Sequence, residues 1–212
     1  MSELNKLCDI KQNGRDSEWE KAFLKAFSSS EVFLKNEEPF QGPDGFSYME
    51  LSTAEGEKVD KKDFLPWCAH AGVGLVVNLK KNQTPDYVFN YGMVWNYLLR
   101  GIFLNDESDN SKESLKGSKV LVHKIMEGYL PQYARENIRD FLALNKIFNC
   151  KIGLISRGEG TSYEILWYVP EGENWSDKDQ KTLMEALSWF LPLNYQVGWV
   201  KTNDKSLHLE EL

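Results

Sequence analysis

A run of polar and charged residues in the middle of the chain sets the strongest limit on how it can fold. The segment Asn105–Lys119, NDESDNSKESLKGSK, contains a single apolar residue, Leu115. Such a segment cannot bury enough apolar surface to offset the entropy lost on ordering, so we predict a polar linker or mobile loop over residues 105–119. It separates an N-terminal domain, residues 17–104, from a C-terminal domain, residues 120–212. The polar residues 1–16 are predicted to be disordered or loosely attached.

Hydrophobic periodicity predicts the same order of elements in both domains: helix, strand, strand, helix, strand. Two consecutive strands between helices are unlike the simple alternation of a doubly wound parallel sheet. We therefore predict an α+β fold made of two similar-sized αββαβ-type halves with mixed or antiparallel sheets. The predicted helices are 17–28, 63–71 (starting from Asp60 or Asp63 and interrupted at Pro66), 93–100, 131–146 and 176–190. The predicted strands are 32–35, 46–51, 73–79, 86–91, 120–124, 151–156, 163–169 and 195–201.

Charge, hydropathy and cysteine content indicate which classes of partner and which cellular compartment to expect. The formal net charge is −7, and basic residues occur at most two in a row, as in Lys61-Lys62, which is flanked by Asp60 and Asp63. Because binding to duplex nucleic acid depends on clustered Lys and Arg, we expect no nucleic-acid partner. The longest apolar runs are about four residues, far below the roughly 18–20 that cross a bilayer, so we expect no membrane partner. Three widely spaced cysteines and a polar N-terminus without a hydrophobic leader favour a reducing, cytoplasmic location.

The sequence offers little of the chemistry that catalysis or metal binding requires. Cys68 and His70 are the one close cysteine–histidine pair, whereas a zinc site usually takes four ligands. We interpret Cys68 as a small buried apolar residue, with a Cys68 nucleophile activated by His123 as the alternative. The glycine pairs in residues 71–74 and 157–160 do not have the context of a dinucleotide-binding or phosphate-binding loop, and both are typical of turns. We therefore assign no catalytic residue, no cofactor and no metal.

Aromatic residues are abundant, and some of them are candidates for a binding surface. Most must fill the core, but Trp and Tyr are also typical anchors of protein interfaces. Phe64-Leu65-Pro66-Trp67 is the best exposed candidate, because a proline disfavours a continuous helix and tends to direct the run outward. A dense aromatic stretch over residues 87–97 adds further candidates. We predict a protein-binding patch made of Phe64, Trp67, Tyr91 and Trp95.

Two stretches of the chain share their apolar pattern and element order with a known bacterial family. In the first, Ala22-Phe23-Leu24 leads into Glu31-Val32-Phe33-Leu34, and Phe64-Leu65-Pro66-Trp67 precedes a Gly-Val-Gly strand. In the second, Tyr129-Leu130-Pro131 opens a helix that is followed by two strands, a helix and a strand. Over residues 18–200 the chain resembles the enhanced-serine-sensitivity (SseB) family. The resemblance implies an N-terminal and a C-terminal domain of this order, and it carries no catalytic residues.

These observations leave three hypotheses for the function. The first is a non-enzymatic protein-binding or regulatory module of the bacterial cytoplasm, which engages another protein through an exposed apolar patch. The second is a small-ligand-binding protein or an enzyme without a recognisable motif, with a deep aromatic pocket and convergent polar groups such as Arg100, Arg135 or Arg157. The third, by analogy of size, charge and class, is an acidic secretion-chaperone-like homodimer.

Overall fold

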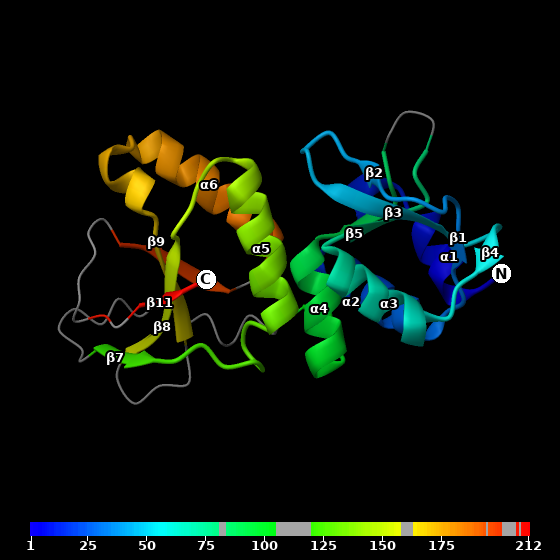
Figure 1. Cartoon of the computed structure of the whole chain (residues 1–212). Helices are drawn as coiled ribbons and strands as arrows, with labels where there is room; N and C mark the ends of the chain where they lie inside the picture. Colours follow the sequence, from blue (N-terminus) through cyan, green and yellow to red (C-terminus); the bar gives the residue numbers. More distant parts are fainter. Residues whose placement is uncertain (81–83, 105–119, 158–162, 194, 201–206, 208) are drawn as a thin grey trace. The chain divides into compact units, whose positions relative to one another are not determined.

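The computed structural model describes residues 1–80, 84–104, 120–157, 163–193, 195–200, 207 and 209–212 (Figure 1). It divides into two compact units, residues 1–94 and 95–212, and each is described by itself. The predicted linker, residues 105–119, lies outside the described residues. The boundary between the two units falls inside helix α4 (Tyr91–Arg100) and not at the predicted residue 104. The second half of this helix belongs to the second unit and forms hydrogen bonds within it. Trp95 Nε1 donates to the Phe190 carbonyl at 2.8 Å, for example.

The first unit is built on a mixed six-stranded sheet with the strand order β4-β1-β3-β5-β6, in which β2 also pairs with β3. Strands β3 and β5 run parallel, and the other pairs are antiparallel. The elements of this unit are α1 (Glu3–Cys8), η1 (Gln12–Gly14), α2 (Ser17–Ser29), β1 (Phe33–Leu34), β2 (Phe40–Gln41), β3 (Ser47–Ser52), β4 (Glu57–Lys58), α3 (Lys61–Ala71), β5 (Gly74–Val77) and β6 (Tyr87–Phe89).

The second unit is built on a mixed five-stranded sheet with the strand order β10-β9-β8-β11, in which β7 also pairs with β8. Strands β9 and β10 run parallel, and the other pairs are antiparallel. The elements of this unit after α4 are β7 (Val120–His123), α5 (Gln132–Leu144), β8 (Lys151–Arg157), β9 (Tyr163–Tyr168), η3 (Pro170–Asn174), α6 (Asp177–Trp189), β10 (Gln196–Trp199) and β11 (Glu210–Glu211).

Both units contain the same αββαβ core. In the first, α2 precedes the antiparallel pair β1–β3, and α3 then leads to β5, which is parallel to β3. In the second, α5 precedes the antiparallel pair β8–β9, and α6 then leads to β10, which is parallel to β9. Parallel neighbours need a crossover connection, and α3 and α6 provide it. The predicted fold class, α+β with two similar αββαβ-type halves and mixed sheets, is confirmed.

Helix α2 covers the first sheet with aromatic side chains. Trp19, Phe23 and Phe27 recur at i, i+4 and i+8, so they share one face of the helix. The Phe23 ring stacks on Tyr87 at a centroid distance of 4.8 Å, and the Phe27 ring lies 4.5 Å from that of Phe89. Both partners belong to β6, so this aromatic stack joins the start of the unit to its last strand.

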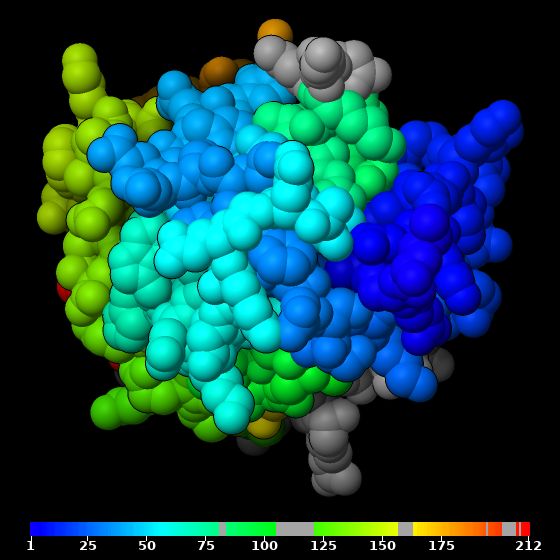
Figure 2. Space-filling view, turned by 90° about the vertical axis from the view of Figure 1, so that its right-hand side faces the viewer, coloured from blue at the N-terminus to red at the C-terminus, as the bar shows by residue number. Residues whose placement is uncertain are grey.

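The N-terminal residues are an integral part of the first unit, contrary to the prediction that residues 1–16 are disordered or loosely attached. Leu4 of α1 is fully buried, and the Trp19 indole N–H donates to the Leu7 carbonyl at 3.0 Å. Figure 2 shows the N-terminal residues, in dark blue, packed against the segments that follow them. The sequence did not reveal this attachment because a helix of six residues is too short to produce a periodic apolar pattern.

Helix α3 is continuous through Pro66, where the sequence predicted an interruption. The Asp60 side chain caps its first turn, and Gly72 ends it in the left-handed conformation with φ of 69°. Proline removes one intrahelical hydrogen bond and strains the preceding turn. Burial of Leu65 and Cys68, at 1 % and 0 % exposure, offsets that cost and keeps the helix intact.

Candidate functional site

Two of the four residues of the predicted patch are core residues. Tyr91 and Trp95 are both 0 % exposed. The Tyr91 hydroxyl donates to the Ala69 carbonyl at 2.7 Å, and the Trp95 indole N–H donates to the Phe190 carbonyl. The assignment of these two residues to an exposed patch is therefore corrected. The first six residues of α4 are all buried, and the first five of them, residues 91–95, carry no charged or amide side chain, so this part of the helix belongs in a core.

Phe64 and Trp67 lie together at the surface of α3. They are three residues apart, which places them side by side on a helix, and their rings stack at a centroid distance of 6.2 Å. The Trp67 side chain is 45 % exposed, and Phe64 is half-buried. The structure thus brings together two of the predicted residues, in a small aromatic surface that we call the α3 surface.

The second unit contains an open groove of about 430 Å³, lined by residues of α5, of α6 and of the segments directly next to these helices. Helix α6 contributes side chains with the spacing of one helix face, from Asp179 through Leu183 to Ala186. Helix α5 contributes Phe141, whose ring lies 5.0 Å from that of Phe190 at the end of α6. The residues that line the groove are Phe141, Asn145, Ile147, Trp175, Asp179, Thr182, Leu183 and Ala186.

The loop that follows α5 is held in a defined shape beside the groove. Lys146 N–H donates to the Ala143 carbonyl at 3.0 Å, and Ile147 N–H donates to the Leu142 carbonyl at 2.9 Å. This is the Schellman pattern, in which the residue after the cap takes the left-handed conformation. Lys146 does so with φ of 60°, a position that usually belongs to glycine. The chain therefore turns sharply, with Ile147 directed inward at 8 % exposure.

Two large apolar side chains that are adjacent in the chain to the groove residues Asn145 and Ile147 face solvent. Leu144, the last residue of α5, is 85 % exposed, and Phe148 in the following loop is 53 % exposed. The Phe148 N–H donates to Glu171 Oε1 at 3.1 Å, and Asn149 takes a second left-handed conformation with φ of 56°. Left-handed non-glycine residues are uncommon and concentrate at functional sites. We call residues 144–148 the knob.

The polar rim of the groove carries negative charge. Asp179 lines it, and the Asp179 carboxylate accepts a hydrogen bond from the Ser176 hydroxyl at 2.6 Å. Glu171 lies next to the knob through its bond to the Phe148 backbone.

We expect replacement of Lys146 by glycine to stabilise the second unit by roughly 1 kcal/mol, because glycine adopts the left-handed conformation without the steric cost that a Cβ imposes. The midpoint of urea unfolding measures the change. Replacing Lys124, which is exposed and outside this turn, by glycine is the matched control and should not stabilise. A loss of stability in Lys146→Gly would show that the lysine side chain contributes more than its backbone conformation costs.

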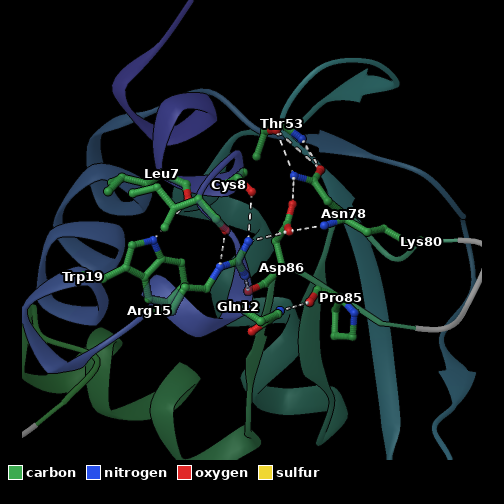
Figure 3. Close-up of polar contacts among 11 residues, drawn as sticks. Leu7, Cys8, Gln12, Arg15, Trp19, Thr53, Asn78, Lys80, Pro85 and Asp86 are labelled. Atoms are coloured by element: carbon green, nitrogen blue, oxygen red, sulfur yellow. Dashed lines mark hydrogen bonds and ion pairs between the residues drawn. The ribbon is translucent and has the colours of Figure 1, made fainter.

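A buried ion-pair network organises the first unit (Figure 3). Arg15 Nη2 and Lys80 Nζ donate to Asp86 Oδ1 at 2.9 and 2.7 Å. Asn78 Nδ2 donates to Asp86 Oδ2 at 3.0 Å, and Thr53 N–H donates to Asn78 Oδ1 at 2.9 Å. The Arg15 and Asp86 side chains are only 5 % and 4 % exposed. This network joins the segment before α2 to the strands β3, β5 and β6.

The network is suited to holding the fold together and not to proton transfer. Burial by itself raises the pKa of Asp86, but hydrogen bonds from Lys80, Arg15 and Asn78 together lower it below its usual value of 3.8. A carboxylate that stays ionised and is bonded on both oxygens has little capacity to accept a proton near neutral pH. Arg15 is further fixed by donating to the carbonyls of Ile10 and Cys8, both at 2.9 Å.

The cysteine that the sequence suggested as a nucleophile is inaccessible. Cys68 is fully buried, and burial raises the pKa of its thiol to about 12, so the thiolate is not formed near neutral pH. His123 Nε2 lies 2.8 Å from Ser156 Oγ, a spacing that a nucleophile and its base can have. Ser156 is only 4 % exposed, however, so this contact acts as a polar link between β7 and β8.

The arginines suggested for a ligand pocket are engaged elsewhere. Arg100 Nη2 donates to the Tyr195 hydroxyl at 2.9 Å, and Arg135 pairs with Glu127. Neither is among the residues that line the groove. Arg157 is the last residue of β8, and its side chain is outside what the structure describes. Within the described ranges, no group of three or more His, Cys, Asp or Glu residues could hold a metal ion.

Sequence reasoning missed the groove because its residues have the pattern of an ordinary helix core. Leu183 and Ala186 belong to the apolar stripe that predicts helix 176–190, and such a stripe does not reveal how much of it a neighbour covers. One signal was present in the sequence. Leu144, the last residue of α5, is apolar but does not belong to the buried stripe of Ala134, Ile138 and Leu142.

Comparisons with known proteins give no assignment. No family model matches the chain, and neither a curated protein nor a solved structure matches it. The resemblance to the SseB family therefore stays a prediction. Among the described helices, none is both long enough and apolar enough to cross a membrane.

Proposed function

We propose that this protein is a non-enzymatic protein-binding module of the bacterial cytoplasm, and that the groove between α5 and α6 receives an apolar part of the bound protein. The proposal is carried by one observation: an open groove of about 430 Å³ lies beside two exposed apolar side chains, Leu144 at 85 % and Phe148 at 53 %. Exposed apolar surface next to a concave site is typical of protein interfaces, because binding removes both from water.

A protein partner suits this arrangement better than a small ligand does. Pockets for small molecules enclose most of the ligand. Here the groove is open, and Leu144 and Phe148 lie outside its lining. A partner chain buries the groove and both flanking side chains together, with Trp175 as the kind of aromatic anchor that dominates binding energy.

The α3 surface is a second candidate for the same function. Its specific support is the stacked pair of Phe64 and Trp67, in which a tryptophan is 45 % exposed. Tryptophan is enriched among the residues whose truncation most weakens protein complexes. The α3 surface consists of two aromatic side chains and is not among the residues that line the groove, so we place it second.

A variant that fills the groove tests the proposal. Thr182 is exposed and lines the groove, so Thr182→Trp should occupy it with little effect on folding. Lys181 is adjacent in the chain and does not line the groove, so Lys181→Trp is the matched control. We expect tagged wild type and Lys181→Trp to retain a stoichiometric protein from native lysate, quantified by mass spectrometry, and Thr182→Trp to retain roughly tenfold less.

A Trp67→Ala variant separates the two surfaces. Loss of the partner in Trp67→Ala, with full retention in Thr182→Trp, would move the function to the α3 surface. Retention in both variants would contradict a protein-binding role for either surface. Far-ultraviolet circular dichroism and the unfolding midpoint of each variant verify that the fold is unchanged.

A further inference from the structure

We propose that the partner received by the groove is a second copy of this chain, with the knob of each copy seated in the groove of the other. This inference rests on the proposed function and names the partner of the same site. The proposed dimer is two-fold symmetric, and its interface is formed by α6 and the carboxyl end of α5.

The placement of the knob beside the groove meets the geometric requirement for such a dimer. In a two-fold dimer the same surface is used by both copies, so it must carry the inserting group and the receiving site together. The knob leaves the helix at Asn145, which itself lines the groove, and it presents Leu144 and Phe148 outward. In the proposed dimer the two-fold axis passes near Asn145, so that the knob of each copy faces the groove of the other.

The chemistry of the knob complements that of the groove. Leu144 and Phe148 match an apolar floor formed by Phe141 and Leu183, a side chain of α6 that is 7 % exposed. Between them in the sequence, the exposed Lys146 is basic. The rim contributes the Asp179 carboxylate, which carries the opposite charge.

Other charges of α6 lie away from this contact. Lys178, Lys181 and Glu185 have the spacing of one helix face, and none of them lines the groove. Lys181 and Glu185 pair with each other at 3.6 Å on that face. Among the residues that line the groove, the charged one is Asp179, so a docking Lys146 meets an opposite charge there, and opposite charges across an interface favour correct pairing.

The knob is also preorganised for insertion. Its start is closed by the Schellman bonds of Lys146 and Ile147, and its end is fixed by the bond from the Phe148 N–H to Glu171. Ordering a loop on binding costs free energy, so a loop that already has its bound shape binds more tightly. This accounts for two left-handed non-glycine residues, Lys146 and Asn149, on either side of Phe148.

Analytical ultracentrifugation of the full chain over a range of concentrations tests the dimer. We expect a reversible dimer for wild type, and roughly tenfold or greater weakening for Leu144→Glu and Phe148→Glu, because a charge would enter the apolar groove. Both residues are exposed, so their substitution leaves the fold intact. Lys181→Glu, on the other face of α6, is the control and should dimerise like wild type.

A charge exchange makes the test specific for this arrangement. Lys146→Glu and Asp179→Lys should each weaken the dimer, and the double variant should recover most of the loss, because the pair is restored with its signs reversed. A dimer that Leu144→Glu, Phe148→Glu and both charge variants leave unchanged would overturn the inference. A wild-type monomer at high micromolar concentration would overturn it as well.

The two proposals can fail separately. A monomer that still retains a different protein, and loses it in Thr182→Trp, supports the proposed function and overturns the self-association. A monomer whose captured proteins are the same in Thr182→Trp and Lys181→Trp overturns both. A dimer that is lost in Thr182→Trp supports both.

Discussion

Replacement of Asp86 by alanine is expected to destabilise the first unit by about 3–5 kcal/mol, the range that follows when one partner of a buried ion pair is removed. Arg15 would keep its positive charge in a site where its side chain is 5 % exposed, without the carboxylate that compensates it. Urea unfolding followed by circular dichroism measures the loss. Glu18→Ala is the control, because Glu18 forms an exposed ion pair with Lys21, and such pairs contribute at most about 1 kcal/mol.

The contribution of Asp86 to the free energy of unfolding should decrease as the pH falls. Its folded-state pKa is lowered relative to 3.8 by the hydrogen bonds that outweigh burial, so its stabilising effect is fully present above the pKa of the unfolded chain. It is lost as the pH falls through the lower folded-state pKa. The difference in unfolding free energy between wild type and Asp86→Ala should therefore narrow in acid below about pH 4. A difference that is constant from neutral pH into acid would contradict the role given to the carboxylate.

Replacement of Trp95 by alanine is expected to destabilise the second unit by about 3–5 kcal/mol, because it removes a fully buried aromatic side chain and leaves a cavity. The substitution also removes the donor to the Phe190 carbonyl and the edge-to-face contact with Tyr195 at 5.9 Å. By contrast, Trp67→Ala should change stability by about 1 kcal/mol or less, because the side chain is 45 % exposed. Urea unfolding of the two variants under identical conditions measures the contrast.

The pair of tryptophans distinguishes a core residue from a surface residue with one measurement. Equal and small effects for both variants would contradict the burial of Trp95. Equal and large effects would show that Trp67 packs against more than the Phe64 ring. Trp95 belongs to the second compact unit and Trp67 to the first, so where two unfolding transitions are resolved, each effect is assigned to the transition of its own unit.

The elements that were predicted well are those with local signals. The helix predicted at 176–190 is α6, Asp177–Trp189, and the Ser176 hydroxyl accepts a hydrogen bond from the Asp179 N–H at 3.2 Å. The strands predicted at 151–156 and 163–169 are β8 and β9. Caps and side-chain periodicity act within one or two turns of the chain, so the residues themselves contain the information.

The candidate site was predicted only in part, because exposure is not a local property. Trp67 and Trp95 have similar aromatic neighbours in the sequence, yet one is 45 % exposed and the other is fully buried. Leu144 at 85 % exposure and Leu142 at 2 % lie on the same helix, two residues apart. What separates them is the direction in which each points and what packs against that side of the helix.

The sequence by itself determined the fold class, the order of the elements and the αββαβ character of both halves, since these follow from apolar periodicity and capping. Only the tertiary structure decided that the N-terminal residues are integral, that Arg15 meets Asp86 across 71 positions of the chain, and that a groove opens beside Leu144 and Phe148. The physical reason is that buried ion pairs, cavities and exposed faces arise from contacts between residues far apart in sequence. Such contacts depend on how whole elements pack, which no local pattern encodes.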